Sequence, residues 1–150
     1  MKYLKEALIC ATIVLMNTGF EEVSHTADIA IHVWGSELEE LFISAALGMA
    51  YLAADVTDSD SNVAQSIEVT ADDAETLLVA FLAELLYLLE RDGTVFDVFQ
   101  MRELSTTHLL VSACGHIAKE IRHHIKAVTF NDLEITRNAQ GFEATVVFDV

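Results

Sequence analysis

Two aspartates near opposite ends of the sequence are the first candidates for chemistry. Asp28 follows residues 24–27 (SHTA) and precedes an apolar strand pattern, and Asp149 is the next-to-last residue. A carboxylate among β-branched and aromatic neighbours is costly unless it is solvated, capped or bound to a cation. If the two segments are neighbouring strands, two carboxylates and a backbone carbonyl would form an oxygen site suited to calcium or magnesium. The alternative is that both aspartates simply face water.

Histidines and one lysine are the next candidates. His25 has the chemistry of a general base or a metal ligand, or it orders the turn before the strand. The spacing of His116, His123 and His124 matches no metal-ligand signature, so we interpret that polar stretch as solvated. Lys126 lies in a strand-like segment, where its side chain faces solvent or pairs with nearby carboxylates.

No catalytic motif accompanies these residues. The sequence has no G-x-S-x-G, no H-E-x-x-H and no glycine-rich phosphate loop, and its six glycines are not clustered. No nucleophile has an evident base nearby. We therefore assign no catalytic residue and expect a protein that is not an enzyme.

Two amphipathic helices are predicted between strands. Ile29, Ile31 and Val33 alternate with residues 30, 32 and 34 (A, H and W), which indicates a half-buried strand. Ser36 and Glu39 fit a capping box, and apolar residues then recur at helical spacing as far as Ala53. A second apolar stripe follows the acidic residues Asp72, Asp73 and Glu75 and ends at residues 92–93 (DG).

Strand patterns replace helical ones after Gly93. The candidate strands are 66–70 before the second helix, and 95–103, 107–114, 125–130, 133–137 and 142–150 after it. This order predicts an α+β fold, a two-layer sandwich in which two main helices pack on one face of a mixed β-sheet.

The first 19 residues are a separate segment from the domain predicted over 20–150. Lys2 and Lys5 precede an apolar run over 7–16, as in a signal peptide. That run is too short to span a bilayer as a helix, and no A-x-A cleavage site follows it. We therefore interpret residues 1–19 as an N-terminal extension. It is either a weakly signal-like segment or the result of a misassigned start codon, in which case the true start is Met16.

Charge limits the class of partner. Acidic residues outnumber basic ones 24 to 8, which gives a formal charge of −16. Binding to naked nucleic acid needs clustered Lys and Arg, so the composition favours cations or a basic protein surface instead. The alternative is a solvated acidic surface that serves only solubility. Cys10 and Cys114 lie far apart, which disfavours a zinc site or a disulfide scaffold and favours a reducing compartment. We therefore expect a cytoplasmic protein, and we expect no membrane partner because the apolar run over 7–16 is too short to span a bilayer.

Five sequence segments together resemble the archease family. They are F20-E-E-V-S-H-T-A-D-I29, E37-L-E-E-L-F42, A83-E-L-L-Y-L-L-E90, I125-K-A-V-T129 and the terminal V146-V-F-D-V150. The resemblance covers about residues 20–150 and implies a two-layer α+β fold. It also implies a role in tRNA splicing, in which the protein promotes guanylylation and turnover of the GTP-dependent RNA-splicing ligase, a manganese enzyme.

The resemblance also assigns site residues. The family's metal ligands match Asp28, Asp149 and the backbone oxygen of Val150, with calcium as the associated ion. Lys126 matches a motif lysine and is a weaker candidate, as is His25. One departure is Asn131, where the family usually has a histidine after the aromatic residue that follows K-A-V-T.

Two other functions fit parts of this pattern. A general chaperone or protein-interaction module would use the same acidic surface. A stand-alone metal-dependent hydrolase would use Asp28, Asp149 and His25.

Overall fold

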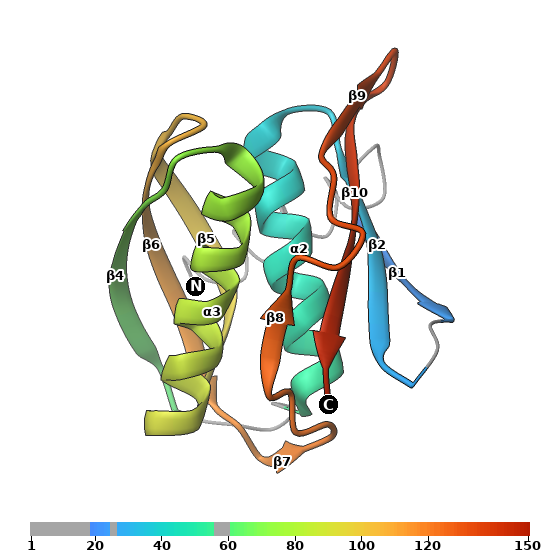
Figure 1. Cartoon of the computed structure of the whole chain (residues 1–150). Coiled ribbons are helices and arrows are strands. Elements are labelled where there is room, and N and C mark those ends of the chain that lie inside the picture. Colours follow the sequence, from blue (N-terminus) through green and yellow to red (C-terminus); the bar gives the residue numbers. More distant parts are fainter. Residues whose placement is uncertain (1–18, 25–26, 56–60) are drawn as a thin grey trace.

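The computed structural model describes residues 19–24, 27–55 and 61–150. Two helices and ten strands lie in these segments (Figure 1). In chain order they are β1 (Gly19–Ser24), β2 (Ile29–Gly35), α2 (Leu38–Ala53), β3 (Ala54–Asp55), β4 (Val63–Thr70), α3 (Ala74–Asp92), β5 (Thr94–Leu104), β6 (His108–Ile117), β7 (Glu120–Ile121), β8 (Ala127–Thr129), β9 (Thr136–Asn138) and β10 (Gly141–Asp149). No helix in the described segments is long and apolar enough to cross a membrane.

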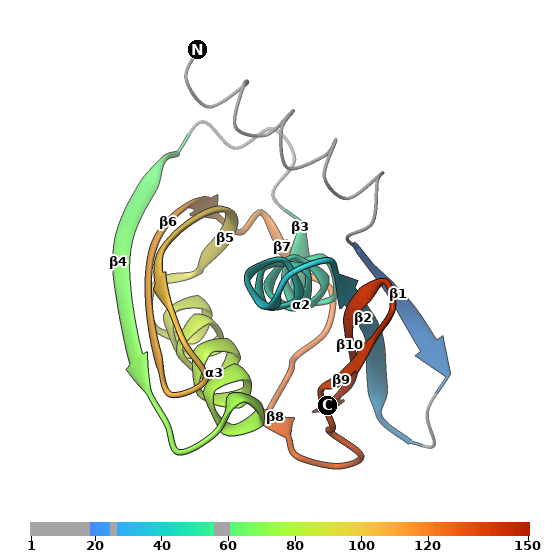
Figure 2. The same ribbon diagram turned by 90° about the horizontal axis from the view of Figure 1, so that it is seen from above.

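The strands form separate antiparallel sheets. The larger sheet has the order β1-β2-β10-β8, with β9 also paired to β10, and a second sheet has the order β4-β6-β5. A short pair, β3-β7, completes the described set. Figure 2 shows α2 and α3 between the two larger sheets, with β4, β5 and β6 curving around α3.

The α+β class is confirmed, but the expected single mixed sheet with both helices on one face is replaced by this arrangement. Every pairing among the described strands is antiparallel. Helix α2 contacts β1, β2 and β10 in one sheet and β5 in the other. Its apolar surface is too wide for one sheet to cover, because nine of its residues are buried.

Helix α2 begins with a capping box, although not the predicted one. The backbone N–H groups of Ser36 and Glu37 donate to Oε2 of Glu40, at 2.7 and 3.1 Å. The N-cap is Glu37 and the box partner is Glu40, one residue later than the predicted pair of Ser36 and Glu39. The carboxylate of Glu40 therefore satisfies donors that the start of a helix leaves unpaired.

Helix α3 has the ends that its sequence predicts. Asp73 is the N-cap and accepts a hydrogen bond from the backbone N–H of Thr76 at 2.7 Å. Gly93 ends the helix with φ = 70°, a left-handed conformation that glycine adopts without steric cost. Between these ends, the ring of Phe81 stacks on Phe42 of α2 and meets Phe99 of β5 edge-on, which joins both helices to the second sheet.

Gly115 allows β5 and β6 to approach each other at an irregularity in their pairing. The register shifts between Phe96 and Val98, and Gly115 pairs with Phe96. A Cβ at position 115 would lie 2.0 Å from the carbonyl oxygen of Val95. A backbone atom cannot move aside as a flexible side chain can, so this position requires glycine.

We therefore expect Gly115→Ala to lower the free energy of unfolding by about 1–3 kcal/mol, because the added methyl group overpacks the strand pair. Urea denaturation followed by circular dichroism measures the change. Cys114→Ala, at the neighbouring half-buried position of the same strand, is the control and should cost less. Equal losses for both variants would show that close backbone approach does not matter here.

Asp97 lies at the same irregularity and is a source of pH-dependent stability. Burial raises the pKa of its carboxyl group, against an opposing effect of nearby His116. Its Oδ1 atom is buried and accepts no hydrogen bond among the described residues. A carboxyl group whose pKa is higher in the folded state favours folding when protonated, so stability is lost as the pH rises and this group ionises.

Asp97→Asn should therefore raise the melting temperature at pH 7, because an amide at this half-buried position carries no charge at any pH. The gain should shrink as the pH falls toward about 4, the usual pKa of an unfolded aspartate. Thermal melts of both proteins across this range measure the difference. A gain that is the same at both ends of the range would contradict the ionisation argument.

Candidate functional site

The pairing of β2 with β10 brings the two predicted aspartates together. Phe148 of β10 pairs with Ile29 of β2, which is the last pair of this register. Asp149 directly follows Phe148 and Asp28 directly precedes Ile29, so the two aspartates lie at the same end of this strand pair. The condition that these two segments be neighbouring strands is thus met.

Asp149 is on the outer face of the larger sheet. Along β10, Ala144, Val146 and Phe148 belong to the buried core between the sheets. Alternating residues of a strand point to opposite faces, so Asp149 points away from that core. Asp149 is exposed and Asp28 is half-buried, so a cation or a partner can reach this pair of carboxylates from outside.

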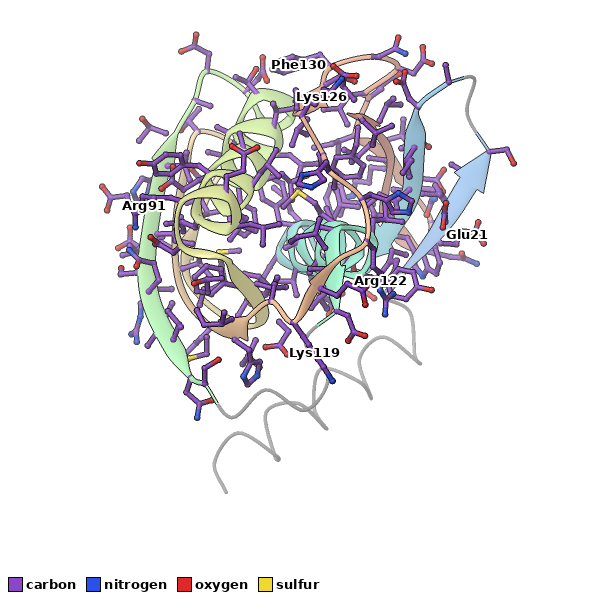
Figure 3. The ribbon with its side chains drawn as sticks, turned by 90° about the horizontal axis from the view of Figure 1, so that it is seen from below. Glu21, Arg91, Lys119, Arg122, Lys126 and Phe130 are labelled. Atoms are coloured by element: carbon purple, nitrogen blue, oxygen red, sulfur yellow. The ribbon has the colours of Figure 1, made fainter. Side chains whose placement is uncertain are left out.

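Strand β8 holds the other side of Asp149. Ala127 pairs with Asp149, and the backbone N–H of Lys126 donates to the Asp149 carbonyl oxygen at 2.7 Å. The hydroxyl of Thr129 donates to the carbonyl oxygen of Val147 at 3.0 Å. The K-A-V-T segment therefore fixes the end of β10. Lys126 is exposed just before β8, and Figure 3 shows it well apart from Lys119 and Arg122 of the preceding segment.

The segment before Asp28 has an unusual backbone conformation. Ala27 has φ = 65°, a left-handed value that residues with a Cβ adopt uncommonly. Such positions persist where the surrounding structure requires them, and they concentrate at functional sites. His25, the other candidate in this segment, lies outside the described residues. The half-buried Val150 packs against the core and anchors the far end of β10.

The donor set fits a hard divalent cation. Asp28, Asp149 and the backbone of Val150 offer only oxygen atoms, the ligands that calcium and magnesium prefer. Across residues 19–24, 27–55 and 61–150, no three His, Cys, Asp or Glu side chains are placed to hold a metal ion together. The set of two carboxylates and backbone oxygens is therefore distinct from a histidine- or cysteine-rich zinc site.

The three later histidines do not form a site. His116 lies 3.7 Å from Asp97, and its Nδ1 is hydrogen-bonded to the backbone oxygen of Ser61. His123 and His124 are exposed. The exposure of His123 and His124 agrees with the interpretation of this stretch as solvated. His116 instead contacts Asp97 and Ser61, which are distant from it in the sequence.

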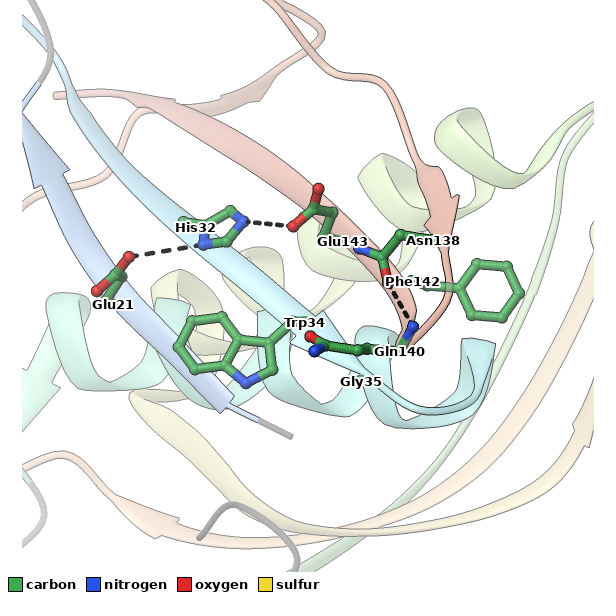
Figure 4. A pocket seen from close by; sticks show the side chains of 8 residues that line it. All are labelled: Glu21, His32, Trp34, Gly35, Asn138, Gln140, Phe142 and Glu143. Carbon is green, nitrogen blue, oxygen red and sulfur yellow. Dashed lines mark hydrogen bonds and ion pairs between the residues drawn. The ribbon is translucent and has the colours of Figure 1, made fainter. Parts of the chain in front are cut away.

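A second group of polar residues on the same outer face was missed by the sequence analysis. His32 lies between two carboxylates, with Nδ1 3.6 Å from Glu21 and Nε2 3.3 Å from Glu143. Together with Trp34 these residues line a cavity of about 300 Å³ (Figure 4). The only sequence signal was the outward position of His32 and Trp34 in the alternating pattern of β2, which says nothing about residues on other strands.

Sequence comparison relates most of this chain to one protein family. Residues 20–150 match the archease protein family (MTH1598/TM1083). A protein archease from Methanosarcina barkeri is 37% identical over 139 residues, covering 87% of this chain and 95% of the relative. One from Thermococcus gammatolerans is 35% identical over 129 residues, covering 81% and 91%.

Solved structures agree with the sequence relatives. The solution structure of protein 1598 from Methanobacterium thermoautotrophicum has a TM-score of 0.69 and 28% identity, covering 88% of this chain and 99% of that one. The crystal structure of a Thermotoga maritima archease, described as a possible chaperone, has a TM-score of 0.64 at 19% identity and covers 87% and 96%, which supports the fold alone. The family match, the sequence relatives and the shared fold agree, and this chain belongs to the archease family.

Proposed function

We propose that this protein is a non-catalytic activator of the GTP-dependent RNA-splicing ligase of tRNA splicing, and that it promotes guanylylation and multiple turnover of that ligase. The observation that supports the proposal is the pairing of β2 with β10, which ends next to Asp28 and Asp149 in a member of the archease family. These are the two carboxylates that the family motifs mark as metal ligands.

A divalent cation, calcium, binds at Asp28, Asp149 and the backbone oxygen of Val150 in this proposal. The bound ion would offset the repulsion between two opposed carboxylates and offer a positive centre to oxygen ligands of a partner. Two features of the chain support this site: the backbone N–H of Lys126 holds the carbonyl oxygen of Asp149, and Asp28 directly precedes β2. Lys126 and His25 remain candidates for contact with the partner.

The partner surface would be basic. A chain with a net charge of −16 is attracted to a positively charged protein face and repelled by the phosphates of nucleic acid. We therefore propose contact with the ligase rather than with its RNA, in the cytoplasm.

Calcium binding is expected to depend on both aspartates. Asp28→Asn and Asp149→Asn should each weaken binding at least tenfold, which corresponds to about 1.4 kcal/mol, because each removes half of the carboxylate charge. Isothermal titration calorimetry with calcium, and separately with magnesium, measures the affinity. Asp72→Asn removes one exposed carboxylate in front of α3 and is the matched control, which should bind like the wild type. If the control loses as much affinity, diffuse charge rather than a site binds the ion.

Ligase turnover tests the function itself. With GTP and manganese, the cognate ligase should complete more cycles when this protein is present, whereas Asp28→Ala and Asp149→Ala should abolish the effect. Circular dichroism of both variants checks that they remain folded. The absence of acceleration by the wild-type protein would refute the proposal.

The same samples separate the two other functions. The description of the Thermotoga maritima structure as a possible chaperone favours a test of aggregation of unrelated proteins. Suppression of aggregation without any effect on the ligase would support a general chaperone. Cleavage of a panel of phosphoesters by this protein alone would support a metal-dependent hydrolase.

A further inference from the structure

The cavity beside Trp34 combines an aromatic wall with two carboxylates. Glu21 on β1 and Glu143 on β10 flank His32 on the central strand β2 (Figure 4). The indole ring of Trp34 lies next along the same face of β2, with its centroid 5.4 Å from that of His32. Asn138 and Gln140 complete the polar rim in the turn that joins β9 to β10.

The charges of this cavity select a cationic occupant. The side chains of Glu21 and Glu143 are 63% and 43% exposed, so each can contact a group that enters from solvent. The contact with His32 uses one oxygen of each carboxylate, and each carboxylate has a second oxygen that can accept hydrogen bonds from a ligand. An anionic ligand would meet two negative charges here in a chain whose net charge is −16.

The aromatic wall favours a guanidinium group among cations. A planar guanidinium stacks on an indole face and donates to carboxylates with two N–H groups at once, which an ammonium cannot do. A guanidinium of this chain already lies over an aromatic ring beside the cavity: that of Arg137 is 5.5 Å from the ring centroid of Phe142. A volume of about 300 Å³ is at the small end for ligand cavities, which suits one side chain better than a cofactor.

The position of the cavity suits a protein partner. Glu143, which lines the cavity, and Asp149 are both odd-numbered positions of β10, so they share the outer face of the sheet, and six residues separate them by about 20 Å. A standard protein interface covers about 800 Å² of each partner, which is wide enough to include both. The cavity and the pair of aspartates therefore fit one contact surface.

We propose that this cavity receives an arginine side chain of a protein partner, with the guanidinium stacked on Trp34 and paired with Glu21 and Glu143. The identity of that partner as the RNA ligase rests on the proposed function. The recognition of arginine does not, because it follows from the cavity alone.

Trp34 makes the cavity directly observable, because it is the single tryptophan of the chain. Titration with a tetra-arginine peptide with blocked termini should change the tryptophan fluorescence in a saturable way. A tetra-citrulline peptide keeps the shape without the charge and should have no effect, and tetra-lysine should bind several-fold more weakly than tetra-arginine. An equal response to citrulline or lysine would overturn the assignment to guanidinium.

The matched variants separate the cavity from general attraction to an acidic protein. Glu21→Gln combined with Glu143→Gln should weaken tetra-arginine binding at least tenfold. Glu84→Gln combined with Glu90→Gln removes the same charge from exposed positions on α3, which does not line the cavity, and should weaken it less than twofold. Equal losses in the two pairs would overturn the proposal.

Trp34→Leu tests the aromatic wall by calorimetry, since fluorescence is lost with the tryptophan. Binding of tetra-arginine should fall at least fivefold in this variant, and unchanged binding would contradict stacking. Failure of the ligase test with intact arginine binding would mean that a partner other than the ligase uses the cavity. If the peptide titrations fail while the ligase effect remains, the proposal that the cavity binds arginine is overturned and the proposed function is not.

Discussion

The antiparallel register between β2 and β10 is the constraint on which the rest of the structure depends. It joins a strand near the start of the described chain to the strand at its end, and it sets which side chains are buried. A slip of one residue would move every side chain of β10 to the opposite face. Phe148 would then lose its place in the core, and Asp149 would be buried opposite the helices, where an unpaired carboxylate is costly.

The core side of this register is fixed by close packing against α2. Ile31 pairs with Val146 and Val33 with Ala144, and all four are buried. Gly48 of α2 lets the helix lie against these strands, since a Cβ there would come within 2.7 Å of Cδ1 of Ile31. At the far end of the strands, a Cβ on Gly141 would lie 2.2 Å from the Gly35 carbonyl oxygen, so the chains meet tightly there too. Close packing on the buried face of the sheet therefore positions the carboxylates on its outer face.

The sequence predicts the local parts of this arrangement better than the distant ones. The span of α2 and the ends of α3 follow from apolar spacing and from Asp73 and Gly93, which act within a few residues. The division into two sheets does not follow, because strand pairing depends on residues far apart in the chain. The candidate Asp28–Asp149 pair came from the residue types at two strand ends and from the motif resemblance, and the structure shows that the strands next to them are neighbours. The sequence gives no sign of the cavity at Trp34, because its lining residues Glu21, His32 and Glu143 come from three strands that meet only when the sheet has formed.

The outer face then joins two kinds of interaction on one rigid support. Exposed carboxylates chiefly accelerate encounter with a basic partner and exclude wrong ones, and they add little affinity because solvent screens them. An indole ring can add affinity, because stacking removes apolar surface from water. A cation at Asp28 and Asp149 would change the charge of one end of the face while leaving the Trp34 end unchanged. A cation bound at the proposed metal site would therefore change how a partner binds at that end of the face relative to the Trp34 end. The sheet between the two ends would not need to move.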